Sequence, residues 1–345
     1  MRRGTHMSEL FSDTTLPVAF IEPWLADNAQ YVQDISRLGN AFEHHVPRLR
    51  SAMEDKGVIR KLVHANRVAL GAVDASVVEV ELCDQVNLLF QVVRVADDGQ
   101  TRLGKSVRKS GVSGHQIQLV RTPLRMMLEC EELAATTNEM TIADNSFWSF
   151  LMEANQAITN ATHSNNSYLA EAVTRLVDEG VFIDMLQNRL VIAMSKRSES
   201  DSLVEGVSDR TMYELILNEG EFVRPMKITD GTRGSFGIER RRFSDGDRQL
   251  INEIYHERLG VMFFKPHSWS RAFRIEGYLD KMRDDAWLMP LLNAIAHHTA
   301  TRTIVEPWPQ FMADFTAKKL SAMAPLYGSH NRHRLPILTA QRTAL

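Results

Sequence analysis

The sequence has very little cysteine and no long apolar run. Its 345 residues include two cysteines, Cys83 and Cys130, which are too few for a disulfide framework or a cysteine zinc site and fit a reducing cytosol. No apolar run approaches the roughly 18 residues of a membrane span. The opening Met1–His6 also lacks the apolar region of a signal peptide. We therefore expect a soluble, cytoplasmic protein without a membrane partner.

Sequence motifs of several enzyme classes are absent as well. The chain has no Gly-x-x-x-x-Gly-Lys-Ser/Thr phosphate-binding loop, no Gly-x-Ser-x-Gly elbow and no His-Glu-x-x-His motif. Any step driven by ATP would therefore have to come from a partner. The formal net charge of −3 argues against a uniformly basic nucleic-acid-binding surface, although it leaves room for local basic patches.

The residues that are present predict an α/β protein. Hydrophobic residues make up 44% of the chain and charged residues 24%, which is enough apolar material for a proper core. An N-terminal segment, residues 1–64, contains a predicted helix over Asn28–Glu54. Residues 65–325 alternate strand and helix patterns and predict a mixed β-sheet flanked by helices. Residues 326–345 form a basic tail that we expect to be flexible.

Asp74 follows an apolar stretch, Val68–Val73, and precedes an alternating stretch, Val77–Leu82. This pattern predicts a buried strand that ends at Asp74 and a second, half-buried strand after it. By itself the carboxylate fits a turn residue, because Asp readily hydrogen-bonds its own backbone. The alternative is a metal ligand on a rigid sheet.

A second strand pattern, Met140–Ala143, also ends in an Asp-x-Ser sequence that begins at Asp144. Between the two lies a helix that we expect to begin at Thr122–Pro123, with Thr as N-cap and Pro at the first position. A helical wheel places Glu131 in the apolar arc of that helix and Glu129 on its polar side. A glutamate in an apolar arc is costly unless it is paired or binds a metal.

Another carboxylate, Asp314, lies in the first turns of a helix that follows Pro307 and Pro309. Oxygen ligands without cysteine favour Mg²⁺ or Mn²⁺. Two such ions about 4 Å apart can activate water and stabilise the leaving oxygen in phosphodiester cleavage. Aspartates from separate elements that meet at strand ends would suit this chemistry.

Basic residues occur in several places that could contact a nucleic-acid backbone. A predicted loop over Arg102–Lys109 contains Lys105 and is either a solvated hairpin tip or a phosphate contact. Lys196 follows a predicted strand, Leu190–Met194. The other candidates are Arg233, in a Gly-rich loop, and the cluster Arg240, Arg241 and Arg242.

Five short motifs, taken in order, resemble the NurA nuclease family over residues from about 65 to 325. They are Ala72–Ser76, the helix Arg125–Ala135, Ile142–Ser146, Met194–Ser198 and Pro307–Asp314. The chain departs from the family pattern at four positions. Ala75 and Asn145 stand where the family usually has Gly, Glu306 stands where an aromatic residue is common, and Asp314 stands where His is common.

The resemblance implies a ribonuclease H-like core and a ring-shaped homodimer that degrades DNA with Mn²⁺ (or Mg²⁺). It also implies a HerA-type hexameric, DNA-translocating ATPase as partner. The implied activity is that of a 5′-to-3′ exonuclease and single-strand endonuclease, in DNA end processing or anti-phage defence. Asp74, a helix glutamate, Asp144 and Asp314 would then be the catalytic metal ligands. The spacing from Arg125 favours Glu129 and the wheel favours Glu131, so both stay candidates.

Two other functions remain open from the sequence. The chain could be a catalytically weak DNA clamp or adaptor of the ATPase complex, with the acids as structural remnants. It could also be an unrelated ribonuclease H-like enzyme that acts on RNA and contacts the 2′-hydroxyl. The first alternative is tested by whether the acids converge within metal-binding distance.

Overall fold

The computed structural model divides the chain into two compact units, Met1–Lys56 and Gly57–Leu345. It describes residues 39, 42–43, 45–82, 85–112, 116–195, 203–204, 207–228, 242–299 and 306–322. In the first unit the described residues up to position 55 are helical, which confirms the helix expected there as far as it can be followed.

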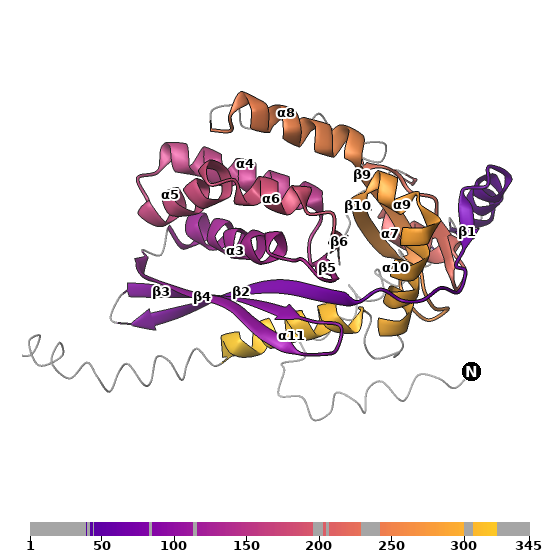
Figure 1. Ribbon diagram of the computed structural model, residues 1–345, viewed down its shortest axis with the longest axis horizontal. Coiled ribbons are helices and arrows are strands. Elements are labelled where there is room, and N and C mark those ends of the chain that lie inside the picture. The colour runs from indigo at the N-terminus through magenta and orange to yellow at the C-terminus, as the bar shows by residue number, and fades with distance from the viewer. Residues whose placement is uncertain are drawn as a thin grey trace, which may run out of the picture. The chain divides into compact units, whose positions relative to one another are not determined.

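A ten-stranded mixed sheet runs through the second unit (Figure 1). Its strands are β1 (Ile59–Lys61), β2 (Leu70–Leu82), β3 (Gln85–Val95), β4 (Thr101–Val112), β5 (Met140–Ala143), β6 (Val191–Ser195), β7 (Glu221–Val223), β8 (Met226–Lys227), β9 (Leu259–Lys265) and β10 (Phe273–Tyr278). The order is β1-β7-β9-β10-β6-β5-β2-β3-β4, and β8 pairs with β9. The pairs β2–β5 and β5–β6 are parallel, and the others are antiparallel. This is the mixed β-sheet that the sequence predicts.

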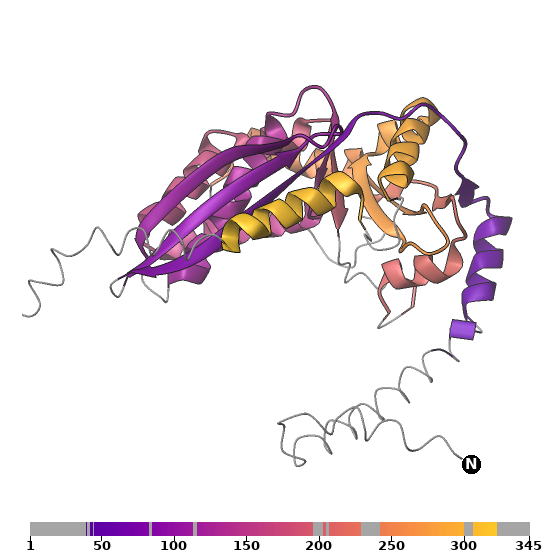
Figure 2. The ribbon, with the colours of Figure 1, turned by 90° about the horizontal axis from the view of Figure 1, so that it is seen from below.

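Helices cover both faces of this sheet. They are α3 (Ile117–Ala134), α4 (Phe147–His163), α5 (Ser167–Val173), the π-helical turn η2 (Thr174–Asp178), α6 (Val181–Gln187), α7 (Asp209–Ile216), α8 (Asp245–Glu253), η4 (Ile254–Arg258), α9 (Leu279–Met282), α10 (Asp285–His298) and α11 (Trp308–Ala322). Helices α3 to α6 lie on one side of β2–β4 and α11 on the other (Figures 1 and 2). Each helix in the described ranges is too short or too polar to span a bilayer.

The strand around Asp74 differs from the expectation. Leu70–Leu82 is one continuous strand, so Asp74 lies within β2 and not at its end. The apolar part, Leu70–Val73, pairs with β5, and β3 joins the other side of β2 from Ala72 onward. The alternating part pairs with β3 alone. A strand flanked on both sides and covered on both faces is apolar throughout, and one with a solvated face alternates. The change of pattern therefore marks where β5 leaves β2.

Two further boundaries differ from the expectation. The predicted loop over Arg102–Lys109 is most of strand β4, which pairs with β3 through an irregular register. Helix α3 begins at Ile117, so Thr122 is no N-cap and Pro123 lies inside the helix. Pro123 is the seventh residue of α3, where it removes one backbone hydrogen bond and crowds the carbonyl of Leu119. The apolar residues before it extend the buried face of the helix.

Candidate metal centre

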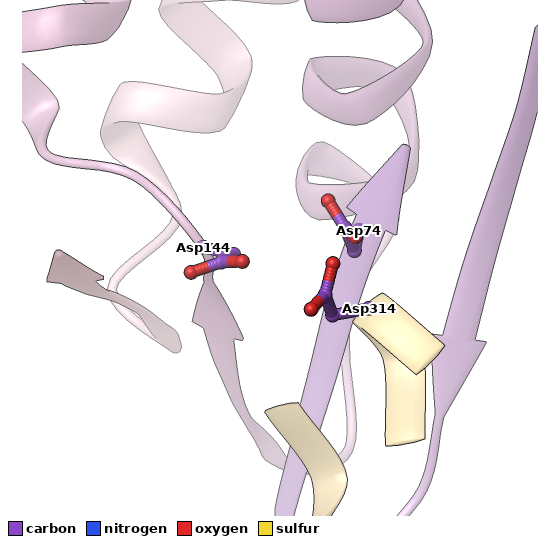
Figure 3. Close-up of side chains that lie close together, drawn as sticks. All are labelled: Asp74, Asp144 and Asp314. Atoms are coloured by element: carbon purple, nitrogen blue, oxygen red, sulfur yellow. The ribbon is translucent and has the colours of Figure 1, made fainter. Parts of the chain in front are cut away.

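Three aspartates from distant parts of the chain converge at one point. Asp74 comes from β2, Asp144 directly follows β5, and Asp314 lies on α11 (Figure 3). One carboxylate oxygen from each lies within 4.8 Å of the others, and all three residues are half-buried. Such a cluster is costly without a cation, because like charges at this distance repel.

The parallel pairing of β2 and β5 brings the first two aspartates together. Val73 is opposite Ala143 in this ladder, so the next residues along the two strands are Asp74 and Asp144. Strand β5 ends at this point, whereas β2 continues. Ligand sites in sheets of this kind form outside the carboxyl ends of parallel strands. The repeated Asp-x-Ser sequence thus reflects two neighbouring strands in register.

The two serines of this repeat have different contacts. Ser76 donates its hydroxyl to the carbonyl of Ala317, 2.9 Å away, and so joins β2 to α11. Ser146 is the N-cap of α4, and its hydroxyl accepts the backbone N–H of Ser149. The first serine therefore fixes the helix that supplies Asp314, and the second begins a helix behind Asp144.

Gln310 connects α11 to the centre. Its Nε2 donates to Asp144 Oδ1 at 2.7 Å and to the carbonyl of Met194 at 3.2 Å, and its side chain is buried. Gln310 lies one helical turn before Asp314 on α11, so one helix face both orients Asp144 and supplies a carboxylate. Gln310 is not among the residues that the sequence predicts for this centre, although its i, i+4 spacing from Asp314 places both side chains on one side of the helix.

Glu129 lies on the buried side of α3 beside this centre. It is 3% exposed, and burial raises the pKa of its carboxyl well above the ordinary value. Arg125 opposes that increase, while Asp74 and Asp144 add to it. The charges of both aspartates therefore act on Glu129. Glu129 is not one of the three residues whose carboxylate oxygens lie within 4.8 Å of one another.

Glu131 points away from the aspartates, contrary to the helical wheel. Lys105 Nζ donates to Glu131 Oε2 at 2.9 Å, and the Arg175 guanidinium binds Oε1 at 2.5 Å. Partial burial acts to raise the pKa of Glu131, but these two cations hold it below its ordinary value. The wheel expectation was wrong because α3 is covered both by the sheet and by α4–α6, and five consecutive residues, Met126–Cys130, are buried. A helix covered on several sides has no single apolar arc.

Arg125 and Glu153 are charged residues that interact with the aspartates and Glu129. Burial alone would lower the pKa of Arg125, but the carboxylates of Glu129, Glu153, Asp74 and Asp144 raise it overall. Arg125 donates to Glu153 Oε1 at 3.5 Å. Burial raises the pKa of Glu153, and hydrogen bonding from Asn145 opposes this. Glu153 is not predictable from the sequence, because its place beside Arg125 of α3 depends on how the helices pack.

The donor set fits a hard divalent cation. All three converging ligands are carboxylates, which Mg²⁺ and Mn²⁺ prefer. Oxygens on opposite sides of such an ion lie about 4.2 Å apart, twice a metal–oxygen distance of about 2.1 Å. The observed 4.8 Å limit therefore accommodates one ion with little movement of the side chains. Lys318 Nζ, 2.7 Å from Asp314 Oδ2, already supplies one positive charge.

Only two of the predicted DNA-contacting residues, Lys105 and Arg242, lie within the described residues. Lys105 lies on β4 and is paired with Glu131. Arg242 donates to Asp178 Oδ2 at 2.6 Å and to the Thr174 hydroxyl at 3.2 Å. The remaining candidates lie outside the described residues: Lys196, Arg233, Arg240 and Arg241.

Replacing Gln310 with methionine should weaken Mn²⁺ binding about 10- to 100-fold, the usual effect of removing a group that orients a metal ligand. The change keeps the length of the side chain but removes the N–H group that holds Asp144. Isothermal titration with Mn²⁺ measures the effect. The control is Gln187→Met, at an exposed position of α6, which should bind as wild type. Equal affinity of both variants would show that Asp144 needs no support from α11.

Comparison with known proteins supports the fold. No model of a known protein family matches the chain, and no curated protein matches it in sequence. The crystal structure of the NurA nuclease from Sulfolobus solfataricus matches with a TM-score of 0.63 at 12% identity, over 91% of this chain and 98% of that chain. A crystal structure of NurA with manganese matches with a TM-score of 0.50 at 10% identity, over 83% and 93% of the two chains. The chain therefore has a NurA-like fold.

Proposed function

We propose that the protein is a metal-dependent deoxyribonuclease that hydrolyses phosphodiester bonds at the aspartate centre. The observation that carries the proposal is the convergence of Asp74, Asp144 and Asp314 within 4.8 Å. The NurA-like fold supports it, because one of the similar solved structures is described as a nuclease and another contains manganese. The proposed activities are 5′-to-3′ exonuclease and single-strand endonuclease.

In this proposal the residues of the centre have different roles. Asp74, Asp144 and Asp314 hold Mn²⁺ or Mg²⁺, with Glu129 as a further ligand that would complete a two-metal site. Bound metal supplies an activated water and stabilises the leaving oxygen. Gln310 orients Asp144 through its N–H group, and Arg125 balances the negative charge behind the ligands. The three aspartates are half-buried and so remain partly exposed to solvent.

Assays with linear single- and double-stranded DNA, labelled at the 5′ or the 3′ end, test this function. We expect cleavage with Mn²⁺ or Mg²⁺ and none with EDTA, and the position of the surviving label gives the direction of digestion. Asp144→Asn should remove the activity while the protein stays folded. A wild-type protein that binds DNA but is inert with every metal would favour the clamp or adaptor.

We further propose that the protein acts as a homodimer together with a HerA-type hexameric ATPase, in DNA end processing or anti-phage defence. The absence of a phosphate-binding loop in the sequence supports an external source of ATP-driven movement. Light scattering measures the molar mass of the purified protein and so shows whether it is a dimer. Co-purification with the ATPase, followed by the cleavage assay with and without ATP, measures the partnership. Equal cleavage in both conditions would contradict a functional need for the motor.

A further inference from the structure

Helix α11 carries an exposed row of aromatic rings next to the metal centre. This aromatic stripe consists of Trp308, Phe311 and Phe315. Trp308 is 40% exposed and Phe315 39%, and Phe311 is half-buried between them. The ring centroids lie 5.9 Å apart for the first pair and 5.7 Å for the second, whose planes meet at 19°.

The stripe lies on the side of α11 that faces away from the sheet. Its residues follow an i, i+3, i+7 spacing and so share one face. The opposite face is buried against the sheet through Gln310, Ala313 and Ala317. At 3.6 residues per turn, Asp314 lies between the two faces, about 60° to 120° around the helix from the three rings. A strand of nucleic acid on the stripe would therefore lie beside the metal centre.

Positive charge accompanies the rings. Lys319 Nζ lies 4.3 Å from the ring centroid of Phe315, and the neighbouring Lys318 is paired with Asp314. Aromatic rings interleaved with cations are the combination that binds single-stranded nucleic acid, because bases stack on the rings and the cations attract the backbone.

We propose that the aromatic stripe is a stacking site for the bases of single-stranded DNA that is led to the aspartate centre. It rests on the proposed nuclease function for the identity of the ligand. The stripe spans about 10 Å along α11 at 1.5 Å per residue. That is the length of roughly three stacked nucleotides at about 3.4 Å each. The faces of paired bases are covered by their neighbours in a duplex, so the site selects single strands or frayed ends.

Anisotropy of a fluorescein-labelled oligo(dT) of 15 nucleotides, measured with the full chain in EDTA, tests this proposal without cleavage. The double variant Trp308→Ala/Phe315→Ala should bind at least about tenfold more weakly, since each stacked base contributes on the order of tenfold. A fully paired duplex of equal length should bind both proteins alike. Leu215→Ala is the control, because Leu215 is 48% exposed but lies on α7. Trp308→Phe should retain most of the affinity, since it keeps a stacking ring.

Unchanged oligo(dT) affinity of the double variant would overturn the stacking site. Light scattering on the same samples separates the competing explanation, because a dimer that dissociates in the double variant with no loss of oligo(dT) binding identifies the stripe as an interface between copies. The two proposals can fail separately. If wild type cleaves DNA and the double variant binds oligo(dT) normally, only the proposed stacking site is contradicted. If wild type is inert but its oligo(dT) binding depends on the stripe, only the proposed nuclease function is contradicted.

Discussion

Asp74→Asn should lower metal-dependent DNA cleavage by at least about 10³-fold, which corresponds to a barrier higher by about 4 kcal/mol. Asp74 lies in the interior of β2, one residue beyond the last residue pair with β5. Because the strand holds this position in place, no carboxylate from elsewhere can move in to substitute for Asp74. An amide keeps the shape of the carboxylate but loses its charge, so the cation loses one of its three charged ligands.

The same variant should be at least as stable as wild type in EDTA. Removing one of three carboxylates that share a 4.8 Å region relieves a repulsion worth on the order of 1 kcal/mol in a well-hydrated setting. Thermal unfolding with and without Mn²⁺ measures both effects, because an ion that binds only the folded state raises the melting temperature. We expect Mn²⁺ to stabilise wild type and to leave Asp74→Asn unchanged.

Asp98→Asn is the matched control for Asp74→Asn. Asp98 lies in the turn between β3 and β4, where its carboxylate accepts the N–H of Gln100 at 2.9 Å. The control should cleave DNA and respond to Mn²⁺ as wild type does. If Asp74→Asn kept full activity and a full Mn²⁺ response, the aspartate centre would not be the catalytic site.

Arg125→Met should destabilise the protein by about 2–3 kcal/mol at neutral pH. Removing one partner of a fully buried ion pair costs about 3–5 kcal/mol. A third of the Arg125 side chain is exposed, and solvent screening reduces the effect. The loss is large because Arg125 faces several carboxylates together, among them Glu129 and Glu153. Urea unfolding monitored by circular dichroism measures it.

This loss should grow as the pH rises. Burial already holds the pKa of Glu129 above its ordinary value of 4.5, and Arg125 opposes that increase. Without Arg125 the pKa of Glu129 in the folded protein rises further. A carboxyl that ionises less readily in the folded than in the unfolded state costs no stability below the unfolded pKa. It lowers stability as the pH rises from about 4.5 through the folded pKa. The deficit of Arg125→Met should therefore be smallest near pH 4.

Two further variants identify the cause of the Arg125 effect. Arg121→Met, one turn earlier on α3, breaks an exposed pair with Glu79 and should cost less than about 1 kcal/mol. Adding Glu129→Gln to Arg125→Met should restore much of the lost stability and flatten its pH dependence. A deficit that is the same at every pH would instead indicate lost packing of the arginine side chain.

The sequence was informative where a local pattern decides the structure. The short apolar runs Met140–Ala143 and Leu190–Met194 identified β5 and β6, and the two Asp-x-Ser sequences pointed to Asp74 and Asp144. The Pro-rich start of α11 placed Asp314 in its first turns. These features depend on neighbouring residues along the chain, because backbone geometry fixes which side chains alternate and where a helix begins.

Only the tertiary structure decided which acids meet and what surrounds them. The helical wheel favoured Glu131 as the acid on the buried side of α3. The packing of α4–α6 on α3 instead buries Glu129 near the aspartates, and Glu131 pairs with Lys105 and Arg175. Likewise, the roles of Arg125 and Gln310 arise from residues far away in sequence. The amino-acid sequence by itself predicted strands β5 and β6, the start of α11 and the three aspartates that converge. The burial of each carboxylate and the cations that oppose its charge followed from how those elements pack, because burial and charge pairing depend on contacts between distant segments.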